Sequence, residues 1–277
     1  MSPVDHRGEM MTGATLAALK AVILAAAVYF YVALAMGGPG DSVCIIVFVC
    51  ATISSVAGFA FSAISGSMLL HVVSDPIEAV QIMLVASIAL QAYSVWALRK
   101  IIKSRELLPY FAGGASTVAP GIYFLLNTPT TIYLLVLGGF LTTYGTYMCL
   151  RSPLRLESNS LAGRVMVGAL GGITGATAAF PGAFITVWCA AHGWDKQHQR
   201  AIYQPFILGM QIVTLVMLAM FAPMTGMRLD LLQYIAPAVF GCHLGLVVFS
   251  MLSSTQFNKI VSAFLVVSGV AMSLKAL

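Results

Sequence analysis

Two groups of small and hydroxyl-bearing residues interrupt long apolar stretches of this sequence. The first reads AGFAFSAISGSMLL over residues 57–70, and the second reads GGITGATAAFPGAF over residues 171–184. Glycine weakens a helix and proline removes a backbone donor, so each group predicts a break within an apolar helix. We expect the two breaks at the tripeptides Ser65-Gly66-Ser67 and Pro181-Gly182-Ala183.

A helix that begins at such a break offers free N–H groups and the positive end of its dipole, which favour a bound anion. We expect no Lys or Arg at mid-span after the first helix, so dipoles and neutral donors would hold that anion. The predicted substrate-binding set joins both breaks with glutamines of the following segments: Ser62, Ser65, Gly66, Ser67, Gln81, Gln91, Pro181, Gly182, Ala183, Thr186, Gln204 and Gln211. The alternative, that these small residues only let helices pack closely, stays open.

Other chemistry is sparse. His71 and His243 lie in or near apolar segments and are candidates for proton relay, because ionisable groups within membranes often serve function. Ser65 or Ser67 beside one of these histidines would suit an intramembrane hydrolase, although no GxSxG motif is present. The five cysteines form no CxxC pair, and the sequence has neither metal-ligand spacing nor a GxxxxGK[ST] motif. We therefore expect no metal, no cofactor and no ATP hydrolysis.

The composition indicates which elements must position these residues. The chain is 60% hydrophobic and 8% charged, whereas soluble domains are about 25% charged. We therefore expect an all-α protein that crosses the bilayer many times, and we attribute the net charge of +5 to loop orientation rather than to nucleic-acid binding. Nine apolar segments are predicted, at residues 14–36, 43–73, 76–98, 107–126, 131–150, 163–192, 198–221, 229–251 and 257–275.

The order of these segments predicts two related halves, separated by roughly 120 residues, as in duplicated transporters. Each half starts with one of the two long, glycine-broken segments and continues with three ordinary spans. We divide the chain into an N-terminal segment with the first helix (1–41), repeat 1 (42–150), a cytoplasmic linker (151–162) and repeat 2 (163–277). A non-transporting scaffold is a further alternative, which broken helices argue against because they are costly in lipid.

The distribution of Lys and Arg favours one topology over another. If all nine segments cross, nine of the fourteen basic residues lie on the side of the basic loop at residues 99–105. If the two broken segments enter and leave on the same side, that number rises to twelve. Because cytoplasmic loops are enriched in Lys and Arg, we expect two re-entrant hairpins. Each half then has an odd number of crossings, so the two halves would be inverted repeats.

Three stretches of sequence resemble a known family. These are the glycine-centred segment near the start of each half, APGIYFLL at residues 119–126, and GWDKQHQRAIYQPF at residues 193–206. Over residues 42–277 the chain is similar to the TauE/SafE sulfite exporter family, also called the toluene sulfonate uptake permease family, whose motifs are richer in glycine. The resemblance implies a multi-pass transporter of the bacterial inner membrane. It also implies a small sulfur-containing anion as substrate, such as sulfite, sulfoacetate or thiosulfate.

Overall fold

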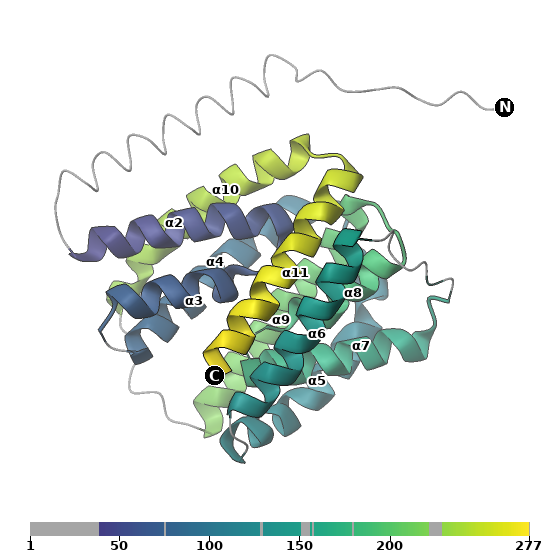
Figure 1. The fold of residues 1–277 in the computed structure, drawn as a ribbon, viewed down its shortest axis with the longest axis horizontal. Helices are drawn as coiled ribbons and strands as arrows, with labels where there is room; N and C mark the ends of the chain where they lie inside the picture. The colour runs from purple at the N-terminus through teal and green to yellow at the C-terminus, as the bar shows by residue number, and fades with distance from the viewer. Residues whose placement is uncertain are drawn as a thin grey trace.

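A computed structural model describes residues 39–74, 76–127, 130–150, 156, 158–178, 180–221 and 229–276. The predicted first helix at 14–36 lies outside these residues. Within them, every regular element is helical (Figure 1). The elements are α2 (Pro39–Ala57), α3 (Phe61–Val72), α4 (Pro76–Leu98), α5 (Ser104–Asn127), α6 (Thr130–Leu150), α7 (Leu161–Ala178), α8 (Gly182–Ala191), α9 (Lys196–Phe221), the 3-10 helix η1 (Leu229–Tyr234), α10 (Ile235–Met251) and α11 (Ser254–Ala276).

Both long apolar segments fold as helical hairpins. In the first, Cys50 of α2 and Met68 of α3 bring their sulfur atoms within 3.7 Å, so α3 returns alongside α2. In the second, the Leu156 amide, which precedes α7, donates to the carbonyl oxygen of Ala191 at the end of α8, at 2.9 Å. The chain therefore reverses its direction between α2 and α3 and again between α7 and α8.

The first break lies eight residues before the predicted tripeptide. Gly58 has a φ of +89°, a left-handed conformation that ends α2, and α3 begins at Phe61. Ser65, Gly66 and Ser67 lie inside α3, where the Ser65 hydroxyl donates to the Phe61 carbonyl oxygen at 2.8 Å. The prediction was wrong there because a glycine is compatible with a helix interior when its neighbours continue the helix.

The second break lies where the sequence predicts it. Pro181 occupies the N-cap position, and α8 begins at Gly182. The glycines at 171, 172 and 175 do not interrupt the chain, because α7 runs through them to Ala178. Gly172 instead lets α7 approach α5 so closely that an added Cβ would meet the backbone of Gly114. Close helix packing therefore accounts for part of the glycine-rich motif.

The helices pack in pairs that join the two halves of the chain. Helix α10 lies along α2, α7 lies along α5, and α11 lies along α6 (Figure 1). The central helices α4 and α9 contact one another. Helix α4 also contacts α10, which comes after α9 in the chain, and helix α9 also contacts α5, which follows α4. One buried core joins α2, α3, α4 and α10, and the other joins the remaining helices. The two halves are thus intertwined.

Most helix lengths suit a bilayer. Among the described residues, three helical stretches are both long and apolar enough to cross a membrane: Gln81–Leu98, Lys196–Met217 and Asp230–Met251. Helices α5, α6 and α11 have 24, 21 and 23 residues, and a crossing needs about 20. The segments predicted from residue 43 onward agree with these bounds to within four residues, apart from the breaks within the two long segments.

Candidate functional site

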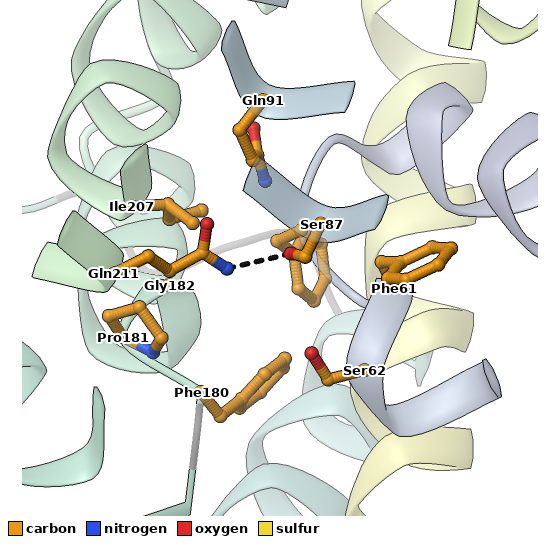
Figure 2. A pocket seen from close by; sticks show the side chains of 10 residues that line it. Phe61, Ser62, Ser87, Gln91, Phe180, Pro181, Gly182, Ile207 and Gln211 are labelled. Atoms are coloured by element: carbon orange, nitrogen blue, oxygen red, sulfur yellow. Dashed lines mark hydrogen bonds between the residues drawn. The ribbon is translucent and has the colours of Figure 1, made fainter. Parts of the chain in front are cut away.

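The turns of the two hairpins meet at a narrow cavity, which we call the tip cavity. In this conformation its free volume is about 10 Å³, room for about one water molecule. One wall comes from the first half of the chain and the other from the second half (Figure 2). The lining residues are Phe59, Phe61, Ser62, Ser87 and Gln91 from the first half and Phe180, Pro181, Gly182, Ile207 and Gln211 from the second half.

The two walls are related residue by residue. Four residues of the first half have a partner in the second half at a constant distance of 120 positions. These pairs are Phe61 with Pro181, Ser62 with Gly182, Ser87 with Ile207, and Gln91 with Gln211. The fifth pair, Phe59 and Phe180, is 121 positions apart, and its ring centroids lie 5.9 Å apart. The tip cavity is therefore built from equivalent positions of the two halves.

The returning arm of each hairpin begins at the cavity. Helix α3 begins at Phe61 and α8 at Gly182, and neither helix has a side-chain hydrogen bond at its N-cap. The N-terminus of each helix therefore presents its dipole and first amides near the cavity. A side chain at Gly182 would not fit, because an added Cβ would lie 2.7 Å from Ile207 Cδ1.

Two glutamines supply the amide groups of the cavity. Gln211 Nε2 donates to the Ser87 hydroxyl oxygen at 2.7 Å, as Figure 2 shows. Gln91 Nε2 donates to the Gly58 carbonyl oxygen at 3.4 Å. The Oε1 atoms of both glutamines are buried without a hydrogen-bond partner. These two oxygens are acceptors, so as placed they would be satisfied by a hydrogen-bond donor, and an anion would be met by the NH2 groups only after the amides turn.

The structure brings five of the predicted site residues together and places the others elsewhere. Those around the tip cavity are Ser62, Gln91, Pro181, Gly182 and Gln211. Four predicted residues are buried beyond its lining, namely Gln81, Ala183, Thr186 and Gln204, and Ser65, Gly66 and Ser67 belong to α3. The sequence analysis missed Ser87 and Ile207, although each precedes a predicted glutamine by one helical turn.

A fully buried cation lies behind the first turn. Arg200, near the start of the segment predicted at 198–221, lies in the second turn of α9 with 0% exposure. Its guanidinium donates to the Ser55 carbonyl oxygen and, when the Gln204 amide is turned so that its oxygen faces the guanidinium, to that oxygen at 2.8 Å. Phe249 covers the guanidinium at 4.1 Å. Among the described residues, no carboxylate forms an ion pair with Arg200, so its positive charge near the turn is not neutralised.

The candidate histidine chemistry is separate from the tip cavity. His243 lies in α10, and its Nδ1 is 2.6 Å from the Tyr93 hydroxyl. The Ser65 hydroxyl donates to the Phe61 carbonyl oxygen within α3, so Ser65 and His243 have different hydrogen-bond partners. His71 lies in the last turn of α3, and the side chains of Ser67 and His71 fall outside the described part of the structure. The contacts of the described side chains therefore include no Ser–His pair of this kind.

Comparison with known proteins identifies the family. A search of curated proteins found no match, and a search of solved structures found none either. The family model described as Sulfite exporter TauE/SafE matches residues 43–272, which include both hairpins and every residue of the tip cavity. With that match over most of its length, the chain belongs to the sulfite exporter TauE/SafE family of membrane transporters.

Proposed function

We propose that this protein carries a small sulfur-containing anion or organosulfonate across the bacterial inner membrane by secondary transport. The anion binds in the tip cavity, between the N-termini of α3 and α8. The observation that carries the proposal is the cavity itself, where two uncapped helix N-termini and two glutamines come from equivalent positions of the two halves. Helix N-termini bind anions through their free amides and dipoles.

The neutral groups of the cavity suit an anion that must also be released. A serine hydroxyl either donates or accepts, so Gln211 can turn its NH2 group toward an anion while Ser87 donates to its oxygen. Arg200 lies behind the turn and contributes positive potential without binding the anion directly. Such a site attracts the anion but lacks a direct ion pair, which favours moderate affinity.

The arrangement of the halves supports inverted repeats. The packing of α2 with α10 corresponds to that of α7 with α5, and α4 and α9 correspond to one another. The helix ends that the charge pattern predicts to be cytoplasmic also contact one another. Lys196 at the start of α9 donates to the Ser250 carbonyl oxygen at the end of α10, and Gln199 donates to the Asn258 side-chain oxygen at the start of α11. In this arrangement the two hairpins re-enter from opposite faces and meet near the midplane.

Flux measurements test the proposal. Purified protein in proteoliposomes is expected to transport radiolabelled sulfite, sulfoacetate or thiosulfate with saturable kinetics. The same assay with and without a pH gradient tests proton coupling, for which His71 and His243 are the candidates. If none of these anions shows saturable flux, the proposal is wrong, and a non-transporting scaffold or an intramembrane hydrolase becomes the better hypothesis.

Substitutions in the cavity locate the site. Gln91→Leu and Gln211→Leu each remove an amide donor, so we expect the KM for the transported anion to rise about tenfold, the effect of losing a hydrogen bond to a charged group. Gln233→Leu is the matched control, because Gln233 is exposed on η1 and distant in sequence from the cavity residues. Unchanged kinetics for both cavity variants, with protein levels equal to the control, would exclude the tip cavity as the binding site.

A further inference from the structure

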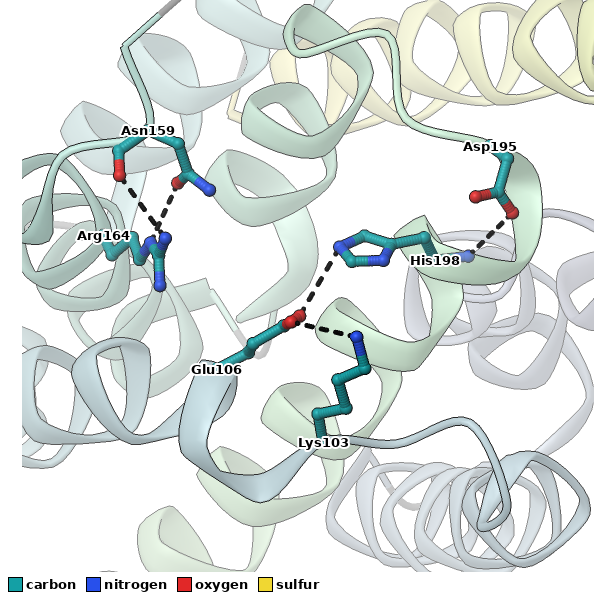
Figure 3. A network of polar contacts seen from close by, with 6 residues as sticks. All are labelled: Lys103, Glu106, Asn159, Arg164, Asp195 and His198. Carbon is teal, nitrogen blue, oxygen red and sulfur yellow. Dashed lines mark hydrogen bonds and ion pairs between the residues drawn. The ribbon is translucent and has the colours of Figure 1, made fainter.

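A second polar cavity lies where the first turns of α5, α7 and α9 approach one another, with a volume of about 160 Å³. It is separate from the tip cavity, because the two share no lining residue. Figure 3 shows its charged groups, which come from three different segments of the chain. The polar side chains that line it are Glu106, Tyr110, Asn159, Arg164, Trp194 and His198.

The acidic residue of this cavity already has partners. Glu106 pairs with Lys103 at 3.5 Å through one carboxylate oxygen and with His198 at 3.6 Å through the other. Asp195, at the start of α9, accepts hydrogen bonds from the backbone amides of Gln197 and His198. Both carboxylates are therefore engaged by groups of the protein itself, which reduces their repulsion of an incoming anion.

Arg164 keeps donors for a ligand. Its Nε donates to the Asn159 side-chain oxygen at 2.8 Å, and its Nη2 donates to the Asn159 backbone oxygen at 3.4 Å. Among the described residues, no ion pair includes Arg164. A guanidinium has five N–H donors, and two of them account for these bonds. The remaining donors are available for the planar, bidentate recognition of an oxyanion.

A buried hydroxyl also lacks an acceptor here. Tyr110 is 1% exposed and lines the cavity; the Trp188 indole N–H is within reach of its hydroxyl oxygen as a donor, but the hydroxyl hydrogen has no acceptor among the described side chains. A buried phenol without an acceptor is unfavourable, and a bound oxyanion would supply the missing acceptor. This orphan hydroxyl is independent of the charge arrangement, and both observations indicate the same kind of ligand.

We propose that this cavity is a second binding site for a small oxyanion, held by the Arg164 guanidinium and the Tyr110 hydroxyl. The site lies at the end of the molecule that carries the basic loop, so it would collect the anion from the aqueous side before or after passage through the tip cavity. Only the choice of anion rests on the proposed transport function, because the donors themselves are defined by the cavity.

Trp194 makes this site observable. The chain has three tryptophans, so replacing Trp96 by phenylalanine and Trp188 by histidine, which keeps a ring N–H donor beside Tyr110, leaves Trp194 as the single indole fluorophore. Purified protein with these two changes, in detergent, is titrated with sulfite against chloride at equal ionic strength. We expect a saturable change in Trp194 fluorescence. In the same background, Arg164→Gln and Tyr110→Phe should each raise the apparent Kd, the former by about tenfold or more.

Two controls separate this site from its surroundings. Arg105→Gln removes the same charge from an exposed position beside Glu106 that does not line the cavity, so the titration should be unchanged. The double variant Gln91→Leu/Gln211→Leu should also keep the Trp194 response, because it alters only the tip cavity.

The proposal is overturned if the parent shows no saturable response, if Arg164→Gln and Tyr110→Phe both titrate like the parent, or if the tip-cavity variant loses the response. A retained Trp194 response in protein that shows no anion flux would support this site while rejecting the proposed transport function. The two proposals are therefore distinguishable.

Discussion

Three side chains from distant segments bind the backbone oxygens where α2 ends. Arg200 donates to Ser55 O, Tyr203 donates to Ala57 O at 2.6 Å, and Gln91 donates to Gly58 O at 3.4 Å. A helix leaves its last carbonyl groups unpaired, and such groups are unfavourable inside a membrane protein. These contacts therefore stabilise the first break and fix the position of Phe59 beside the cavity.

Removing one of these donors should destabilise the protein. Tyr203→Phe deletes the hydroxyl that binds Ala57 O and leaves a buried carbonyl without that partner. We expect the free energy of unfolding to fall by about 1–3 kcal/mol, measured by thermal or denaturant unfolding of the purified protein. Tyr123→Phe is the control, because Tyr123 is 67% exposed. Equal stability of the two variants would contradict the proposed role of the hydroxyl.

These residues also explain which parts of the site were predictable. Gly58 and Gly66 have similar apolar and small neighbours, and only tertiary contacts from α9 and α4 select Gly58 as the break. Arg200 follows Lys196 by one helical turn at the start of α9. In the sequence, these charged and polar residues are typical of the boundary between a loop and a membrane span. Its burial depends on Phe249, 49 positions away, so no local pattern could reveal it.

At the scale of helices, glycine positions determine how closely α6 and α11 approach. A Cβ added at Gly138 would lie 2.7 Å from the Gly269 carbonyl oxygen and 3.0 Å from the Ser273 amide nitrogen. A Cβ at the adjacent Gly139 would have no neighbour within 4 Å. The same helix thus offers one constrained and one unconstrained glycine.

This contrast gives a matched pair of substitutions. Gly138→Ala should separate α6 from α11 and destabilise the protein by about 1–3 kcal/mol, the usual cost of overpacking. Gly139→Ala should be neutral or stabilise by up to about 1 kcal/mol, because alanine favours helix more than glycine does. Unfolding of both variants in the same detergent checks the prediction, and an equal loss of stability in both would show that packing against α11 is not the cause.

Helix positions were largely predictable, because apolar runs separated by polar residues and glycine define them directly. The segment predicted at 76–98 corresponds to α4, Pro76–Leu98, and the one at 131–150 corresponds to α6, Thr130–Leu150. The pairing of helices across the halves was not predictable, because it depends on which glycine surfaces fit together in three dimensions.

For the whole molecule, each half packs one helix against the hairpin of the other half, α5 against α7 and α10 against α2. Neither half can bury its hairpin alone, so the two halves should not fold or move as independent domains. The membrane orientation of the hairpins then decides whether the repeats are inverted.

Accessibility of engineered cysteines tests this orientation. In a background without the native cysteines, Gln197→Cys at the start of α9 should react only from the cytoplasm, and Gln233→Cys on η1 only from outside. Nine full crossings would reverse both results, because the second long segment would then place residue 197 outside. Membrane-impermeant thiol reagents applied to intact cells and to inverted vesicles distinguish the two outcomes.

The pairing of the cavity walls has a consequence for ligand shape. Both hydroxyls of the lining belong to the first half, at Ser62 and Ser87, and the equivalent positions of the second half are Gly182 and Ile207. Each half also contributes one glutamine amide, so the two sides of the cavity differ in their hydroxyl groups and not in their amides. An anion bound there would direct its most basic oxygen atom toward Ser62 and Ser87, and its less polar side would face Ile207.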